Sequence, residues 1–251
     1  MVFSWIDFQK PIVIAHRGAP ALGPENTAVG FTAALMAGAD AIETDVRQTQ
    51  DGKLVCFHDA DLLRLTGSAL RIDEISYDHL KDIYPSILLL EEALEAKGHA
   101  GLLLDLKIRD PQSALALCTA LRSVTDKSSL LLGPRSIPLA RELKKLLPDS
   151  AILGFTDSPD HIDEWSNSGA HWLRLWEADL TPEYIEQVRS RNMKIAVMTG
   201  DWRPHDLRTR VLRDVGSIDQ PALASLLQLG PDAVLLDDPR LMAVNRSLLS
   251  S

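Results

Sequence analysis

Short apolar runs alternate with amphipathic stretches along almost the whole chain. The runs are rich in Val, Ile and Leu, as expected for strands that are buried in a parallel sheet. Between them, a capping residue followed by proline marks expected helix starts, as at Ser158-Pro159 and Thr181-Pro182. This alternation predicts βα units around a parallel sheet, which is an α/β fold. The apolar runs lie near residues 12–15, 40–46, 53–58, 101–107, 129–133, 150–155, 171–175, 193–198 and 232–236.

These runs are one more than an eight-stranded barrel needs, and the Asp-Gly dipeptide at residues 51–52 offers a reason. Asp-Gly is typical of two-residue hairpin turns. A hairpin closed there pairs Gln50 with Lys53, and the same register pairs Asp45 with His58. Opposed residues of a hairpin point to the same face, so we expect His58 beside Asp45. The other runs then predict a (β/α)8 TIM barrel whose site lies at the carboxyl ends of the strands.

The stretch that follows the expected hairpin is too long for a simple crossover. We predict a small insertion over about residues 59–100 that packs over the site, with helical pieces near 76–83 and 90–97. The chain has 251 residues, and α/β barrels of that length form one domain. We therefore predict a single barrel domain over residues 1–251.

Composition and charge exclude several classes of function. The hydrophobic content is 45%, the net charge is -9 and the isoelectric point is about 5.2, which argues against nucleic-acid binding because that needs a basic surface. Cys56 and Cys118 are the only cysteines, so no disulfide framework is expected. No secretory signal and no run of about 18 apolar residues is present, which predicts a cytoplasmic protein without stable membrane insertion.

Acidic residues stand at the ends of two predicted strands. Glu43 and Asp45 are spaced i, i+2 and so share a face, and Asp105 ends the strand that follows the insertion. A strand-end acid on its own is as easily a helix cap or the partner of a cation, but three acids beside two histidines favour a metal site. Oxygen ligands select a hard cation, Mg²⁺ or Ca²⁺, over Zn²⁺.

Two histidines also fall at expected strand ends. His16 follows the first strand and His58 follows the hairpin. Imidazole titrates near neutral pH, so one histidine can accept a proton from a nucleophile while the other donates one to a leaving oxygen. The remaining histidines stand in expected helices or loops and are predicted to lie on the surface: His79, His99, His161, His171 and His205.

Two cations next to these residues suit a phosphate group. Arg17 offers a planar fork for bidentate contact, and Lys107 offers a point charge. Salt bridges to the neighbouring acids are the alternative for both and are compatible with function. Gly18 is expected to permit a tight turn, and Asn26 or Thr27 is expected to cap the first helix. Together these residues indicate metal-assisted phosphoryl chemistry.

The ordered motifs of residues 11–66 resemble the glycerophosphodiester phosphodiesterase family. The resemblance resumes at residues 90–94 and 105–107, and more faintly at 229–239. Each motif is weak alone, whereas the ordered set is highly specific. The motifs are His16-Arg17-Gly18, Pro24-Glu25-Asn26-Thr27, Glu43-Thr44-Asp45, Thr49-Gln50-Asp51-Gly52 and His58-Asp59.

The resemblance implies a metal-dependent TIM-barrel hydrolase that cleaves small glycerophosphodiesters to glycerol 3-phosphate and an alcohol. It assigns acid–base roles to His16 and His58. It further implies that Glu43, Asp45 and Asp105 bind the metal. Arg17 and Lys107 are implied to bind the phosphate.

Several positions depart from the family pattern. The third acid is often Glu in the family, and Asp105 is one methylene shorter. The late rim strand usually ends in a Trp-Thr-Val-Asn-like run, but here residues 197–202 read Val-Met-Thr-Gly-Asp-Trp, ending at Trp202. The stretch 203–216 is also unusual, and Glu177 is a further candidate to face the site. These departures leave the alcohol group of the substrate open.

Two other functions compete with glycerophosphodiester hydrolysis. A phospholipase-D-like or lyase activity on intact lipids would favour secretion and an exposed apolar rim, and the sequence shows no signal peptide. A binding barrel that has lost its chemistry would be expected to lack a histidine or a metal-binding acid, yet all of them are present.

Overall fold

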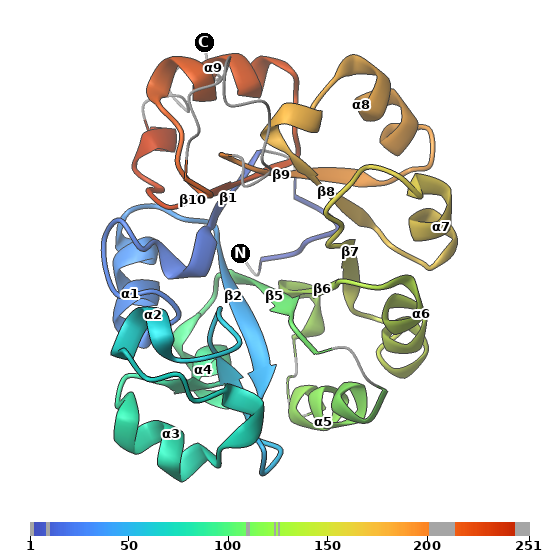
Figure 1. Cartoon of the computed structure of the whole chain (residues 1–251). Coiled ribbons are helices and arrows are strands. Elements are labelled where there is room, and N and C mark those ends of the chain that lie inside the picture. Colours follow the sequence, from blue (N-terminus) through green and yellow to red (C-terminus); the bar gives the residue numbers. More distant parts are fainter. Residues whose placement is uncertain are drawn as a thin grey trace.

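The protein is a closed barrel of parallel strands surrounded by helices (Figure 1). The structure is a computed structural model and describes residues 3–8, 11–108, 111–122, 124, 126–200 and 214–243. Strand β1 pairs with both β2 and β10, which closes the barrel and confirms the predicted TIM architecture. The barrel strands are β1 (Ile12–Ala15), β2 (Ala41–Gln48), β5 (Gly101–Leu106), β6 (Leu130–Pro134), β7 (Ala151–Gly154), β8 (Trp172–Trp176), β9 (Lys194–Met198) and β10 (Ala233–Leu236).

The helices cover the outside of the barrel, as Figure 1 shows. Thr181 caps α8 as predicted, and its side chain accepts a hydrogen bond from the amide of Tyr184. The start predicted at Ser158-Pro159 is wrong, because α7 begins only at Ile162. No helix within the described ranges is long and apolar enough to cross a membrane. The helices are α1 (Ala28–Met36), α4 (Leu90–Ala96), α5 (Pro111–Leu121), α6 (Ile137–Leu146), α7 (Ile162–Asn167), α8 (Pro182–Arg189) and α9 (Gln220–Gln228).

The predicted hairpin is present, but its register differs by one residue. Strand β3 (Leu54–Cys56) runs antiparallel to β2, with Val46 opposite Cys56. The amide of Thr49 bonds the carbonyl of Lys53, so the loop has three residues and ends on Gly52 in the left-handed region. The two-residue turn predicted from Asp-Gly is therefore wrong, and Phe57 rather than His58 stands opposite Asp45.

The insertion after the hairpin has a small core of its own. Helices α2 (Leu63–Thr66) and α3 (Tyr77–Ile83) lie beside the barrel, and β4 (Leu88–Leu89) pairs with β3. The helical pieces predicted near 76–83 and 90–97 are confirmed as α3 and α4. Helix α4 packs against α1 and contributes to the barrel's main core, so it serves as a barrel helix. The insertion core consists of Val55, Phe57, Leu62, Ile72, Ile75, Leu80 and Ile87.

The barrel interior changes from apolar to charged along the strands. Residues spaced by two share a face, so one strand supplies both layers. On β5, Leu103 lies in the apolar interior cluster and Asp105 lines the cavity above it. Segment 3–8 closes the opposite end, where fully buried Trp5 donates to the carbonyl of Ser129. The charged end is therefore the carboxyl end of the strands, where TIM-barrel sites lie.

Candidate active site

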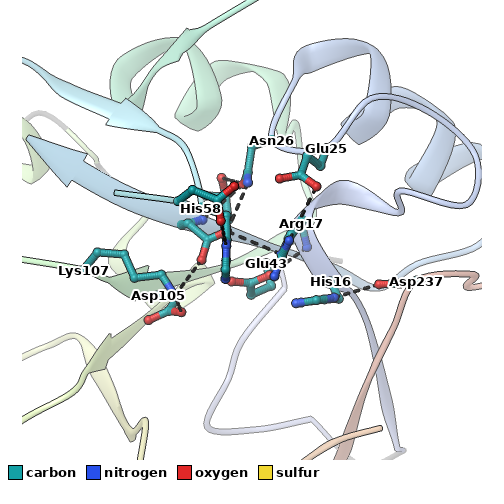
Figure 2. Close-up of polar contacts among 12 residues, drawn as sticks. His16, Arg17, Glu25, Asn26, Glu43, His58, Asp105, Lys107 and Asp237 are labelled. Carbon is teal, nitrogen blue, oxygen red and sulfur yellow. Dashed lines mark hydrogen bonds and ion pairs between the residues drawn. The ribbon is translucent and has the colours of Figure 1, made fainter. Parts of the chain in front are cut away.

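A cavity of about 1030 Å³ opens at the carboxyl ends of the strands. Its volume is that of a small-molecule site. The structure brings together the residues that the sequence predicted for metal binding, phosphate binding and acid–base chemistry, and Figure 2 shows most of them in close-up. These residues are His16, Arg17, Glu43, Asp45, His58, Asp105 and Lys107.

Three buried carboxylates form the centre of this cavity. One oxygen each from Glu43, Asp45 and Asp105 lies within 4.8 Å of the others. Glu43 accepts a 2.7 Å hydrogen bond from the amide of Arg17 and forms no ion pair with a described residue. Burial and the nearby charge of Asp45 raise the pKa of Glu43 to about 7. Among the described residues, this carboxyl group therefore has no ion-pair partner comparable to those of its two neighbours.

Asp45 and Asp105 share Lys107. The ammonium nitrogen of Lys107 lies 3.0 Å from Asp45 Oδ1 and 2.6 Å from Asp105 Oδ2. Burial alone would raise the pKa of Asp45, but Lys107, His58 and Arg17 hold it well below its usual range. Asn26 adds a 3.0 Å hydrogen bond to Asp45 Oδ2. Both acids are consequently ionised at neutral pH.

Asp105 has a further partner that sequence reasoning missed. Arg135 follows β6 and binds Asp105 in bidentate fashion, with Nε 2.8 Å from Oδ1 and Nη2 2.7 Å from Oδ2. Burial opposes the ionised form of Asp105, but Lys107 and Arg135 together lower its pKa. Arg135 lies 30 residues from Asp105 in the sequence and in no recognisable motif, so only the barrel reveals the pairing.

Each of the two histidines is paired with an aspartate. His16 Nδ1 lies 2.7 Å from Asp237 Oδ1, and His58 Nδ1 lies 2.7 Å from Asp59 Oδ1. An imidazole held at Nδ1 has a fixed orientation and leaves Nε2 for another partner. Burial, with help from Lys107 and Arg17, lowers the pKa of His58, and Asp45 opposes that shift. The sequence alone assigned no role to either aspartate, although Asp59 lies within a quoted motif and Asp237 lies within the fainter match at residues 229–239.

His58 lies in the cavity, but a side-chain contact positions it instead of the strand pairing that the sequence predicted. Pairing between β2 and β3 ends before this residue, and Arg47 takes over by donating from Nε and Nη2 to the carbonyl of His58 at 3.0 and 2.8 Å. Arg64 then joins Asp59 to Glu25 with contacts of 2.6 Å to each. This network ties the insertion to the loop before α1.

The loop after β1 positions Arg17 by an uncommon backbone conformation. Arg17 has a φ of 48°, and Gly18 follows with a φ of 75°. A Cβ on Gly18 would lie 2.6 Å from the ring of Phe31, which explains the glycine. Thr27 caps α1 by accepting from the amide of Gly30, whereas Asn26 bonds Asp45 instead. The expected cap is thus Thr27.

The far side of the cavity, after β7 and on β8, carries a second charged cluster. Arg174 is 1% exposed and donates from Nη2 to Asp157 Oδ1 at 2.9 Å. Its guanidinium carbon lies 4.1 Å from the ring centre of Trp176 and 4.8 Å from that of Phe155. Burial lowers the pKa of Arg174 to about 10, so the side chain remains charged at neutral pH. No sequence motif marks this cluster.

The structure also places Glu177 and most of the histidines that were predicted to lie on the surface. Glu177 accepts a hydrogen bond from the amide of Gly200 at 3.1 Å and is not among the residues that line the cavity. His171 is half-buried, so its predicted surface position is wrong: its Nδ1 accepts from the amide of Ile152, which holds the ring against the barrel. The other predicted surface histidines are exposed where described: His79, His99 and His161. Outside the described residues lie Trp202, His205 and residues 203–213 of the predicted 203–216 stretch.

Known proteins resemble this chain over most of its length. The sequence model of the glycerophosphoryl diester phosphodiesterase family matches residues 16–128. A glycerophosphodiester phosphodiesterase of Arabidopsis thaliana is 25% identical over 258 aligned residues, covering 94% of this chain and 73% of that protein. One of Caldanaerobacter subterraneus subsp. tengcongensis is 25% identical over 249 aligned residues, covering 92% and 95%.

Solved structures share the fold at lower identity. A glycerophosphodiester phosphodiesterase of Agrobacterium tumefaciens superposes with a TM-score of 0.73 at 23% identity, covering 93% of this chain and 99% of that one. An Oleispira antarctica phosphodiesterase in complex with the product sn-glycerol-3-phosphate superposes with a TM-score of 0.77 at 22% identity, covering 96% and 98%. These likenesses show the same TIM barrel.

Fold, cavity and relatives together define a TIM-barrel phosphodiesterase, a phosphoric diester hydrolase. The chain belongs to the glycerophosphodiester phosphodiesterase family.

Proposed function

We propose that this protein uses a divalent cation to hydrolyse glycerophosphodiesters to glycerol 3-phosphate and an alcohol. The observation that carries the proposal is a cluster of buried carboxylates beside two histidine–aspartate pairs in one polar cavity. The sn-glycerol-3-phosphate bound to the Oleispira antarctica relative is the product expected here. The charged lining favours a small polar diester over the alternative, an intact lipid. Cytoplasmic location and a single domain over residues 1–251 remain predictions.

The donor set fits a hard cation. Glu43, Asp45 and Asp105 offer oxygen ligands only, which suits Mg²⁺ or Ca²⁺. Glu43 is buried without an ion pair to a described residue, so a cation would stabilise its ionised form. The bound ion would supply positive charge next to the phosphoryl oxygens.

Other side chains of the cavity bind the phosphate and transfer protons. Arg17 and Lys107 bind the phosphate, and the buried Nε of Arg17 has no hydrogen-bond partner among the described residues. Both cations lower the cost of charge on the phosphoryl oxygens. His16 and His58 move protons, because each ring is oriented through Nδ1 by an aspartate and keeps Nε2 for the substrate.

We infer that the glycerol hydroxyl next to the ester attacks the phosphorus. One histidine removes the proton of this hydroxyl, the new O–P bond forms, and the O–P bond to the alcohol breaks as the other histidine protonates the departing oxygen. Water then opens the cyclic phosphate with the histidines in exchanged roles, which yields glycerol 3-phosphate. An intramolecular nucleophile has a large effective concentration compared with water.

A substrate panel with and without EDTA tests the overall reaction. We expect the purified protein to release glycerol 3-phosphate from glycerophosphodiesters with Mg²⁺ or Ca²⁺ and to lose this activity after chelation. Hydrolysis of a lysophospholipid but of none of the water-soluble diesters would support the lipid-directed alternative. Full turnover after exhaustive chelation would overturn the assignment of a metal.

A deoxy analogue tests whether the nucleophile is the neighbouring hydroxyl of the substrate or water. Glycerophosphocholine that lacks the hydroxyl next to the ester should bind and turn over very slowly, because the internal nucleophile is missing. Comparable kcat values for the two substrates would show direct attack by water. Detection of the cyclic phosphate by ³¹P NMR during turnover of the normal substrate is the complementary measurement.

A further inference from the structure

One side of the cavity carries charged and aromatic side chains that the proposed reaction does not use. They follow or belong to β6, β7 and β8, across the cavity from His16 and His58 along the barrel sheet. Arg135 connects them to the centre of the site through its bidentate contact with Asp105. The residues on this side are Arg135, Phe155, Asp157, Arg174 and Trp176.

Arg174 is the unusual member of this cluster. It is 1% exposed, and among the described residues its Nη2 alone has a hydrogen-bond partner, Asp157. Its Nε and Nη1 have no acceptor among the residues that the structure describes. Buried charged donors are nearly always paired, and an unpaired one calls for an explanation. A planar guanidinium with two open donors is a ready partner for an anion.

The neighbouring aromatic rings already hold guanidinium groups. The guanidinium of Arg174 covers the face of Trp176 at 4.1 Å, and both Arg174 and Arg135 lie over Phe155 at 4.8 and 4.7 Å. An aromatic face that already holds a guanidinium cannot also receive an ammonium group. This side of the cavity therefore disfavours a choline-like or ethanolamine-like end of the substrate.

The open donors of Arg174 and the mobility of its one carboxylate partner point to an anion. Arg135 and Arg174 face two carboxylates on this side, Asp105 and Asp157, and Lys107 is shared between Asp105 and Asp45. The Asp157 side chain is 59% exposed, so it can turn towards solvent and release Arg174 Nη2. Asp105 is buried and remains bound to Arg135.

We propose that Arg174, supported by Arg135, recognises a second anionic group of the substrate, a carboxylate or a phosphate carried by its alcohol part. The residue is thus a specificity determinant that selects among glycerophosphodiesters. This inference rests on the proposed function. It adds that diesters with an acidic alcohol are the preferred substrates.

Matched ligands test the preference in two ways. Glycerophosphoserine and glycerophosphoethanolamine differ only by a carboxylate, so the ratio of their kcat/KM values reports its recognition. Calorimetric binding of phosphoserine against phosphoethanolamine, and of glycerol 1,3-bisphosphate against glycerol 3-phosphate, tests a carboxylate and a phosphate separately and needs no turnover. We expect at least a tenfold preference for the more acidic member of one pair or more, as for a charge-assisted hydrogen bond.

Two variants connect this preference to the cluster. Arg174→Met keeps the volume and removes the charge, and should bring the ratios close to one. Asp157→Asn removes the competing carboxylate and should raise the affinity for the acidic ligands several-fold. Arg174→Lys is the alternative if the methionine variant does not fold, and should reduce the preference because it lacks the fork. Arg191→Met is the control, since Arg191 pairs with Asp163 away from the cavity.

The outcomes separate the two proposals. Equal binding within both ligand pairs in the unaltered protein, or ratios unchanged by Arg174→Met, would overturn the role of Arg174 even if diesters are hydrolysed. Selective binding that Arg174→Met abolishes, without hydrolysis of any diester, would support the anion site and reject the proposed function.

Discussion

The two sides of the cavity differ in how the sequence encodes them. On one side, His16, Glu43, Asp45 and His58 come from β1, β2 and the hairpin, within one short stretch of chain. On the other side, the charged and aromatic side chains come from three separate βα units, after β6, after β7 and on β8. The family match covers residues 16–128, which includes the first side and stops before the second. The family model therefore covers the proposed reacting groups and none of the charged and aromatic residues on the opposite side.

Asp105 is where the two sides meet. It lies beside Glu43 and Asp45 in the carboxylate cluster and is also bound by Arg135 from the second side. A carboxylate one methylene shorter than the glutamate usual in the family stays close to its strand, within reach of Arg135. A change on the second side can therefore alter the position of a proposed metal ligand on the first.

The largest effect on kcat is expected from removing a charge in the carboxylate cluster, where we propose that the reaction takes place. Glu43→Gln keeps the shape but removes the carboxylate without an ion pair among the described residues. Loss of a metal's charge stabilisation is worth several kcal/mol, so kcat should fall on the order of 10³-fold. Metal binding measured by calorimetry should weaken in parallel. Glu142→Gln on α6, where the acid pairs with Lys145, is the control. Unchanged metal affinity in Glu43→Gln would remove this residue from the ligand set.

The next effect concerns the two histidines that we propose as proton carriers. His16→Ala and His58→Ala should each reduce kcat by roughly 10²-fold or more, as expected when a positioned acid or base is lost. Circular dichroism verifies that the variants are folded, and His161→Ala, at an exposed position, is the control. If one variant retains near-normal rates while folded, that histidine is structural and another group carries its proton.

A smaller effect is expected at a residue that positions His16. Gly216 has a φ of 87°, and a Cβ there would collide with the carboxylate of Asp237 and lie 2.7 Å from His16 Nδ1. Gly216→Ala should therefore separate this pair, lower kcat roughly tenfold or more and shift its pH profile.

Gly38→Ala is the matched control for this change. Gly38 has a φ of 88°, and a Cβ there meets no atom of the described chain within 4 Å. It should cost about 1–2 kcal/mol of stability through its left-handed backbone and leave kcat unchanged. Equal kcat losses in Gly216→Ala and Gly38→Ala would attribute the effect to backbone strain alone.

The smallest expected effect is on thermal stability, and it concerns His171, which lies at the end of the barrel opposite the cavity. Burial and the charge of Lys144 lower the pKa of His171, whose Nδ1 accepts from the amide of Ile152. The unfolded chain therefore binds a proton at His171 more readily than the folded chain does. The neutral His171 ring contributes to the free energy of unfolding; this contribution is complete above about pH 6.5 and is lost as the pH falls towards the folded pKa. His171→Asn should reduce the loss of Tm between pH 7.5 and 5.5 by on the order of 1 °C. An unchanged pH dependence would show that the ring is equally protonated in both states.

The fold was predictable because its signals are local. Most barrel strands are short apolar runs, because the buried interior demands that pattern wherever it occurs along the chain. The register of the hairpin was not predictable from Asp-Gly alone. Asp51 bonds the hydroxyl of Thr49 and the amide of Tyr77, which ties the loop to the insertion and favours a three-residue turn. A contact 26 residues away thus decided a local geometry.

The sequence by itself determined where the proposed reacting groups lie. Residues spaced by two share a face of a strand, and the carboxyl ends of barrel strands meet at one rim, so residues such as Glu43 and Asp105 lie there together. The tertiary structure alone decided their partners. Asp237 meets His16 across 221 residues because β10 closes the barrel against β1. Arg135 reaches Asp105 because β6 lies beside β5. A hydrogen bond depends on distance in space, and separation along the chain carries no information about it until the barrel has closed.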